Sequence, residues 1–152
     1  MTATVYRLAQ LPELVGKRLG TSEWVLVDQA RIDAFAQATG DHQWIHVDPE
    51  RAAAGPFGTT VAHGFLTLSL LPMFFAQTFT IEGGRMSVNY GLNKVRFPAP
   101  VPVGSRLRAE ITLLACDALD QNAWQFTMSA TIAREGSAKP VCVAEFLSRR
   151  YL

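Results

Sequence analysis

The segment from His63 to Gln77 constrains the fold more than any other part of the chain, because it reads as a helix with apolar side chains on nearly every side. Its apolar members are Phe65, Leu66, Leu68, Leu70, Leu71, Met73, Phe74 and Phe75. A surface helix carries one apolar stripe, whereas a helix that is apolar all round lies buried on most sides. The rest of the chain must therefore wrap around this segment.

The second half of the chain changes to a period of two, which is typical of antiparallel strands with one buried face. Apolar and polar side chains alternate through residues 106–113 and again through residues 124–132. Residues 141–147 are more continuously apolar and fit a central strand, while residues 85–97 predict a strand interrupted by Gly91. A twisted antiparallel sheet can curve around one long helix. We therefore predict an α+β chain with a curved antiparallel sheet wrapped around a long buried helix, the arrangement called the hotdog fold.

Shorter elements precede the buried helix. Residues 24–27 predict an early strand. Asp28 is a suitable N-cap, and Gly40 a suitable end, for a helix between them. Asp48, followed by Pro49, begins a second, short helix, since proline is favoured at the first helical position.

Length and composition fit a single domain over residues 1–152, because this length buries a core without cross-links. The formal net charge of +1 gives no basic excess that would suggest a nucleic-acid partner. Cys116 and Cys142 lack paired spacing, which favours free thiols in a reducing compartment. Residues 1–6 do not read as a secretory signal, and the longest apolar run is shorter than the roughly 18 to 20 residues of a membrane span. We expect a cytoplasmic protein without a membrane span.

The histidines of the chain are concentrated between residues 42 and 63. Asp41 and His46 lie in a predicted loop between two helices, and such loops often carry catalytic groups. A carboxylate beside an imidazole can fix its tautomer, raise its pKa and share one water molecule with it. On spacing alone, however, a surface carboxylate and a packed histidine are the more common interpretation. His42 is expected to be exposed and without a role.

Two further roles are open for these residues. A metal site formed by His42, His46 and His63 with a carboxylate is disfavoured, because the histidines do not form a helical pair of the zincin type. Gly64 lies at the start of the buried helix, where free N–H groups can receive an anion or a developing oxyanion. The same glycine equally fits a role in relieving crowding against the sheet.

The combination of these residues is more specific than any one of them. The motif consists of Gly40-Asp41, Ile45-His46, Asp48-Pro49 and Ala52, followed by Ala62-His63-Gly64. It closely resembles the MaoC-like dehydratase family, also called the R-specific enoyl-CoA hydratases, and residues 41–46 are similar to its NodN-like branch. The likeness continues through residues 90–101 and 103–105, so that it covers nearly the whole chain.

The resemblance implies reversible hydration of a trans-2-enoyl-CoA to an R-3-hydroxyacyl-CoA. Asp41 would take a proton from water, His46 would hold the same water and return a proton at C2, and the N–H of Gly64 would stabilise the thioester oxygen. No metal or redox cofactor is implied, and coenzyme A enters as part of the substrate. A hotdog thioesterase and a non-catalytic subunit that binds acyl thioesters are the alternatives.

The chain departs from the family at two places. Most members carry Asn-Pro where this chain has Gln43 and Trp44. We therefore expect the Gln43 amide to hold Asp41 or His46 in position without contacting the substrate itself. Trp44 is then expected to pack and hold the loop. Pro72 replaces a small polar residue that lines the acyl pocket of some relatives, so the resemblance implies no acyl length.

The substrate carrier and the assembly are further expectations. His63, Lys94 and Arg96 are candidates for binding the substrate or its CoA phosphates, although the last two equally fit solvated strand positions. The resemblance implies a homodimer with the substrate tunnel at its interface. Residues 124–132 and 141–147 supply more apolar surface than one helix can cover, which also predicts an interface.

Overall fold

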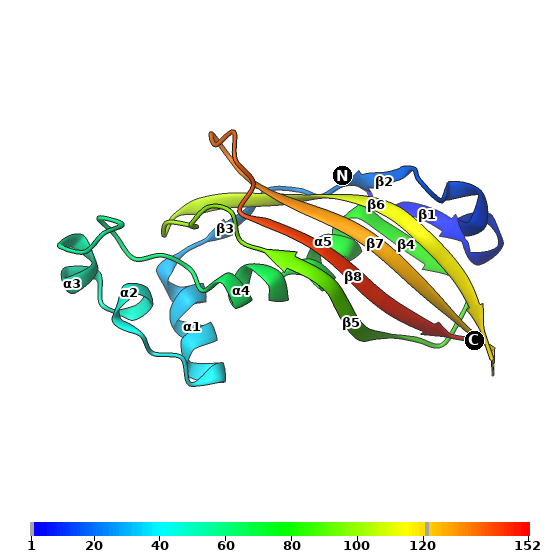
Figure 1. Cartoon of the computed structure of the whole chain (residues 1–152), viewed down its shortest axis with the longest axis horizontal. Coiled ribbons are helices and arrows are strands. Elements are labelled where there is room, and N and C mark those ends of the chain that lie inside the picture. Colours follow the sequence, from blue (N-terminus) through cyan, green and yellow to red (C-terminus); the bar gives the residue numbers. More distant parts are fainter. Residues whose placement is uncertain (1, 121) are drawn as a thin grey trace.

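The computed structural model describes residues 2–120 and 122–152, and in these residues a six-stranded sheet curves around two consecutive helices (Figure 1). The strand order is β2-β6-β7-β8-β5, with β3 also paired to β6, and every pair in this sheet is antiparallel. The strands are β2 (Arg18–Thr21), β3 (Val25–Val27), β5 (Met86–Arg96), β6 (Ser105–Leu119), β7 (Ala123–Arg134) and β8 (Cys142–Tyr151). The predicted hotdog arrangement is confirmed, and β8 is a central strand as its apolar run indicated.

The central helix is divided into α4 (Gly64–Ser69) and α5 (Leu71–Thr78). Leu70, between them, keeps a right-handed helical conformation, so the chain continues in the same helical sense. Pro72 lies in the first turn of α5, and a proline lacks the N–H that the preceding turn would accept and clashes with the carbonyl four residues earlier. The predicted long helix is therefore present with a break near its middle, at Leu70.

The central helix buries one broad face rather than its whole surface. Leu66, Leu70, Leu71 and Phe74 pack into the core formed with the inner face of the sheet. Phe65, by contrast, is 71% exposed. The prediction of burial on most sides is thus too generous, since one side of the helix is left uncovered.

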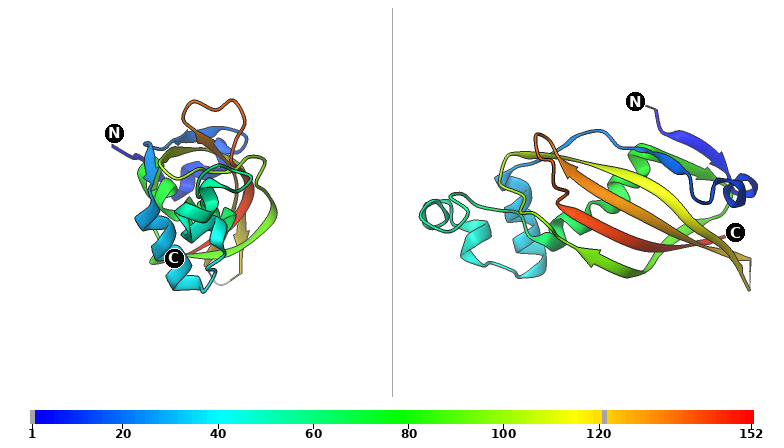
Figure 2. Two further views of the ribbon diagram at one scale, coloured as in Figure 1. Left: turned by 90° about the vertical axis from the view of Figure 1, so that its left-hand side faces the viewer. Right: turned by 45° about the horizontal axis from the view of Figure 1, so that its top comes forward.

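A helical lobe of α1 (Gln29–Thr39), α2 (Trp44–Val47) and α3 (Pro49–Ala53) extends beyond one end of the sheet (Figure 2). The Asp28 carboxylate accepts a hydrogen bond from the N–H of Arg31 at 2.9 Å, and Gly40 ends α1 with a φ of 80°. The Asp48 carboxylate caps α3 in the same way. The predicted caps are confirmed, and they set the direction in which the chain leaves each helix.

A second, two-stranded sheet lay outside the sequence prediction. β1 (Thr4–Arg7) pairs in parallel with β4 (Phe79–Glu82), and a 3-10 helix, η1 (Leu8–Leu14), follows β1. Phe79 and Ile81 alternate with Thr80 and Glu82, so the sequence carried a short period-two signal for β4. None of the described helices is long and apolar enough to cross a membrane.

The exposed apolar surface lies on a different strand from the predicted one. The inward side chains of β7 and β8, such as Phe126 and Phe146, are buried beneath the central helix. Large apolar side chains are exposed instead on the edge strand β5, namely Met86, Val88, Tyr90 and Leu92. The apolar surface from which an interface was predicted therefore lies on β5 rather than on residues 124–132 and 141–147, and the interface itself stays a prediction.

Candidate active site

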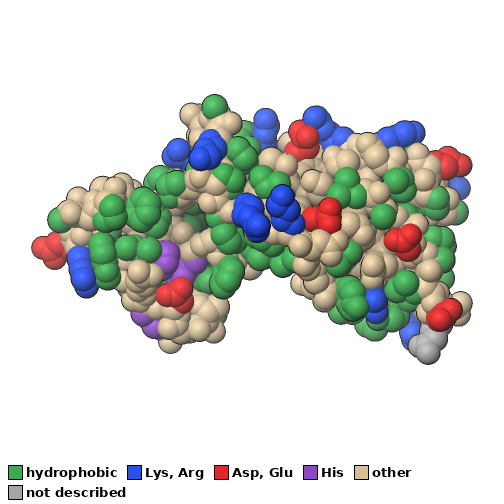
Figure 3. Space-filling model, viewed as in Figure 1, with side chains coloured by type: hydrophobic (Ala, Val, Ile, Leu, Met, Phe, Trp, Pro, Cys, Tyr) green, Lys and Arg blue, Asp and Glu red, His purple; other side chains and the backbone are tan. Residues whose placement is uncertain are grey.

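Asp41, His46 and His63 come together where the helical lobe meets the central helix. Asp41 follows the end of α1, His46 lies on α2, and His63 is the N-cap of α4. Each contributes a carboxylate oxygen or ring nitrogen, and these atoms all lie within 4.8 Å of one another. In the space-filling view one group of histidine atoms lies in a hollow between the lobe and the sheet, and another lies at the outer edge of the lobe (Figure 3). The structure thus brings together Asp41 and His46, the predicted pair, with His63, which the sequence named as a candidate for binding the substrate.

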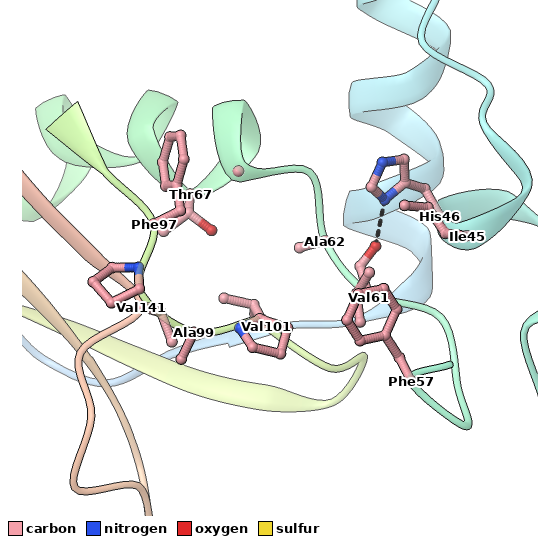
Figure 4. A pocket seen from close by; sticks show the side chains of 13 residues that line it. Ile45, His46, Phe57, Val61, Ala62, Thr67, Phe97, Ala99, Val101 and Val141 are labelled. Carbon is pink, nitrogen blue, oxygen red and sulfur yellow. Dashed lines mark hydrogen bonds between the residues drawn. The ribbon is translucent and has the colours of Figure 1, made fainter. Parts of the chain in front are cut away.

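His46 is enclosed, with 7% of its surface exposed. Its Nδ1 lies 2.6 Å from the carbonyl oxygen of Val61 (Figure 4). A carbonyl oxygen only accepts, so Nδ1 carries the hydrogen and Nε2 keeps a free lone pair. Burial lowers the pKa of His46 from its ordinary value of 6.5, outweighing the bond to Val61 that raises it. The charge of His63 lowers the pKa further, and Asp41 raises it. His46 lies on a one-turn helix and not in an open loop, which corrects the expectation from its sequence position.

His63 is also enclosed, with 3% of its surface exposed. Its Nε2 lies 2.9 Å from the main-chain oxygen of Asp41, so this nitrogen donates. The ring stacks on that of His46, with centroids 3.8 Å apart and an angle of 22° between the planes. Within the described part of the chain, the Nδ1 of His63 is buried without a partner. These contacts join His63 to both residues of the pair, while its role in binding substrate stays a prediction.

The three side chains offer groups for proton transfer and also for metal binding, with their donor atoms within 4.8 Å of one another. The rings of His46 and His63 stack, with centroids 3.8 Å apart and an angle of 22° between the planes. Their outer nitrogens, His46 Nδ1 and His63 Nε2, are directed at carbonyl oxygens, which leaves the other nitrogen of each ring to face a ligand. The expectation that the site works without a metal stays a prediction.

Asp41 is exposed, and its Oδ1 accepts a hydrogen bond from the main-chain N–H of Gln43 at 3.3 Å. The Gln43 side chain is exposed as well, and among the described residues no hydrogen bond to its amide is found. The observed support thus comes from the main chain, and a role for the amide stays a prediction. Trp44 packs as expected: a Cβ added to Gly55 would lie 2.9 Å from its ring, and the Arg51 guanidinium lies 4.4 Å above it.

Two cavities meet at His46 and Gly64. The smaller, of about 210 Å³, contains the polar residues of the site, Asp41, His46 and His63. The larger, of about 320 Å³, has mainly apolar walls (Figure 4). Its walls include Phe57, Val61, Thr67, Phe97, Val101 and Val141. This arrangement suits a ligand whose reacting group is polar or polarisable and is joined to an apolar portion.

Gly64 and Phe97 border both cavities. A Cβ added to Gly64 would lie 3.0 to 3.1 Å from ring atoms of Phe97, so a larger residue requires this ring to shift. In the described residues the N–H of Gly64, at the start of α4, has no hydrogen-bond partner. A free donor next to His46 is available to a ligand oxygen.

Residues 60–62 join the helical lobe to the sheet. On one side, the N–H of Val61 donates to the Ile45 carbonyl at 3.0 Å. On the other, the N–H of Ala62 donates to Val101 at 2.8 Å, and the carbonyl of Thr60 accepts from Val103 at 2.9 Å. The Val61 carbonyl that holds His46 belongs to this joining segment. A main-chain acceptor leaves no side-chain signal, so the sequence could not have indicated it.

Lys94 and Arg96 lie on β5 and are exposed. Arg96 donates to the neighbouring carbonyl of Val95, and neither basic residue lines the two cavities of the site. Phe97, the next residue, does line both. A contact of Lys94 or Arg96 with CoA phosphates therefore stays a prediction, placed at the rim of the site.

A family model and curated relatives match most of the chain. Residues 10–133 match the family described as MaoC like domain. The chain is 57% identical over 146 residues to 3-hydroxyacyl-thioester dehydratase Z of Mycobacterium tuberculosis, covering 96% of this chain and 97% of that protein. It is 47% identical to Nodulation protein N of Rhizobium leguminosarum bv. viciae, covering 93% and 89%.

Solved structures give the same picture. The (R)-hydratase from A. caviae involved in PHA biosynthesis superposes with a TM-score of 0.70 at 26% identity, covering 88% of this chain and 96% of that one. A monoamine oxidase regulatory protein from Archaeoglobus fulgidus superposes with a TM-score of 0.79 at 20% identity, covering 100% and 99%. The second likeness concerns the fold alone.

Proposed function

The chain belongs to the MaoC-like dehydratase family, and from this premise we propose that it hydrates a trans-2-enoyl thioester reversibly to an R-3-hydroxyacyl thioester. The names of its relatives support this direction, since one is a 3-hydroxyacyl-thioester dehydratase and another an (R)-hydratase. Asp41, His46 and Gly64 would carry the reaction.

One observation carries the proposal: the tautomer of His46. Because Nδ1 donates to Val61, Nε2 is the unprotonated nitrogen, and it lies in the cluster that contains Asp41. A neutral imidazole with a lowered pKa is present as a base at neutral pH. A water molecule between the two groups can donate one hydrogen to Nε2 and the other to the Asp41 carboxylate.

In the hydration direction the water oxygen forms a bond to C3 of the enoyl chain, and one proton passes to His46 Nε2. The same proton is then returned to C2, while the hydrogen held by Asp41 stays on the new hydroxyl group. This division of work differs from the one that the family resemblance implied, in which Asp41 took the proton. The reason is the tautomer of His46, which begins the reaction without a proton on Nε2.

Negative charge develops on the thioester oxygen as the C3–O bond forms. The free N–H of Gly64 is the donor that we assign to this oxygen. Loss of one donor of this kind costs about 2.7 to 4 kcal/mol in the activation barrier. Atoms and electrons balance within water and substrate, so the proposed step uses no redox cofactor, and coenzyme A takes part as the carrier.

We expect a homodimer. The exposed apolar side chains of β5 form a row on an edge strand, and Phe65 and Phe97 lie beside the site with large exposed surfaces. Exposed apolar surface of this extent usually marks an interface. A second copy on β5 would also cover the uncovered side of the central helix.

The test is hydration of crotonyl-CoA, followed by the loss of absorbance of the conjugated thioester, with longer enoyl-CoAs compared in the same assay. Chiral analysis should give the R product, and an S-specific 3-hydroxyacyl-CoA dehydrogenase should fail to couple. Release of free CoA thiol would indicate the thioesterase alternative. Binding of enoyl-CoA without turnover would indicate a non-catalytic subunit, and efficient coupling to the S-specific enzyme would refute the stereochemical assignment.

A further inference from the structure

We propose that Gln29 is a positioning residue for His46, and that its side-chain amide holds the imidazole in place by joining three segments of the chain. Gln29 is the first residue of α1 and does not touch the cavities of the site. This proposal rests on the proposed function, because that function makes His46 the base.

Every hydrogen-bonding direction of the Gln29 amide but one is used. Its Nε2 donates to the main-chain carbonyl of His46 and to the Asp33 carboxylate, both at 2.8 Å. Its Oε1 accepts from the hydroxyl of Thr60 at 2.6 Å. Thr60 is 1% exposed, so this hydroxyl has no access to solvent. The amide thus connects α1, α2 and the joining segment at residues 60–62.

The orientation of the amide follows from its partners. A main-chain carbonyl and a carboxylate can only accept hydrogen bonds, so the atom of Gln29 that faces His46 and Asp33 must be the nitrogen. The Thr60 hydroxyl then donates to the remaining oxygen. Glutamate at this position has the same shape but no donor, and its carboxylate would face two acceptors.

The Gln29 amide reaches two groups that hold the His46 side chain in place: the main chain of His46 itself, and Thr60, which precedes Val61. α2 is a single helical turn in which only the Trp44 carbonyl accepts from the following N–H of Asp48, and the His46 carbonyl finds its partner in Gln29. Thr60 precedes Val61, whose carbonyl accepts the Nδ1–H of His46. Gln29 therefore fixes both the main chain that carries the imidazole and the acceptor that selects its tautomer.

The experiment compares Gln29→Met and Gln29→Glu with the full-length wild-type protein in crotonyl-CoA hydration. We expect kcat to fall by about 10- to 100-fold, as for outer partners of metal-binding histidines, with KM changed by less than about twofold. Thr60→Val, which removes only the hydroxyl, should lower kcat in the same direction but by less, and Thr60→Ser should restore it. Gln37→Met, on an exposed position of α1, is the matched control and should keep wild-type values.

A second readout does not need turnover. Nitrogen NMR shifts of the His46 imidazole report which ring nitrogen carries the hydrogen, and the wild type should show it fixed on Nδ1. Gln29→Met and Gln29→Glu should show both tautomers. Unchanged kcat together with a fixed tautomer in these variants would overturn the proposal. The wild-type protein could also prove inactive while its His46 hydrogen is fixed on Nδ1 and Gln29→Met shows both tautomers. That result would refute the proposed function and still support the role of Gln29.

Discussion

Replacing Gly64 by alanine tests the close approach at the start of the central helix. The new Cβ would lie 3.0 Å from Cδ2 of Phe97, while carbon atoms in contact prefer about 3.5 to 4.0 Å. The ring must therefore move by roughly 0.5 Å or more. Since Phe97 is 39% exposed, it has room to do so on its solvent side.

The effect on stability should be small because two contributions oppose each other. Overpacking costs about 1 to 3 kcal/mol, and a partly exposed ring that can move keeps the cost near the lower end. Exchanging glycine for alanine in a helix returns up to about 1 kcal/mol. The free energy of unfolding should thus change by no more than about 1 kcal/mol.

The effect on turnover should be large, because the new methyl group and the displaced ring narrow the approach to the Gly64 N–H. If the thioester oxygen loses this donor, kcat/KM for crotonyl-CoA should fall by about 100- to 1000-fold. Denaturant unfolding measured on the same sample separates this loss from a loss of fold. Gly91→Ala is the control for the substitution itself, since its Cβ would have no atom within 4 Å, and it should not lower the free energy of unfolding.

A Gly64→Ala variant with more than about a third of wild-type turnover would refute the assignment of its N–H to the thioester oxygen. Adding Phe97→Leu distinguishes the two causes of the loss. Recovery of turnover in the double variant would identify the displaced ring as the obstacle, and no recovery would identify the alanine methyl group.

Further tests address the remaining parts of the site. Asp41→Asn and His46→Gln should each remove most of the turnover while near-ultraviolet circular dichroism stays native, and near wild-type rates in either would contradict the proposed pair. Because neutral His46 acts as the base, kcat/KM should fall as the pH falls through the lowered pKa of His46, with a midpoint below 6.5. If kcat/KM instead falls as the pH rises through this range, the imidazolium form of His46 acts as an acid. The φ of Gln43, −58°, suits proline, but Gln43→Pro removes the main-chain N–H that donates to Asp41, so it should reduce kcat several-fold more than Gln43→Ala. Equal kcat values in the two variants would show that this N–H does not support Asp41. Light scattering at micromolar concentration should give the mass of a dimer, and Tyr90→Asp on the exposed strand should shift it toward the monomer, whereas a monomeric wild type would speak against the β5 interface.

Local features of the fold were predictable from sequence because their causes lie within a few residues. Asp28 and Asp48 each bond to an N–H three residues later, and Gly40 ends its helix through its own conformation. The alternation in β6 and β7 likewise reports the buried face of each strand directly. Caps and periods of this kind need no knowledge of the rest of the molecule.

Features that depend on distant pairing were not predictable. The alternation of a strand does not say whether it lies at an edge, so the sequence predicts the exposed apolar surface on β7 and β8 whereas it lies on β5. The motif placed Asp41 near His46, but the tautomer of His46 depends on a main-chain oxygen fifteen residues away. The amide of Gln29 likewise acquires its partners only when α1, α2 and the joining segment come together.

The joining segment at residues 60–62 has a consequence for how the protein loses activity. The proposed proton-transfer pair belongs to the helical lobe, whereas the long strands and the buried face of the central helix form the core. Within the described residues, hydrogen bonds to Val101 and Val103 connect this segment to the loop before β6, and Ile32 of α1 packs in the core. The lobe beyond this anchor is a candidate for a separate cooperative opening unit. Amide hydrogens of the lobe should then exchange sooner than those of β6, β7 and β8, and inactivation by denaturant should precede the loss of sheet structure. The time for which the protein stays active would then depend on the stability of the joining segment at residues 60–62 rather than on the global stability of the fold.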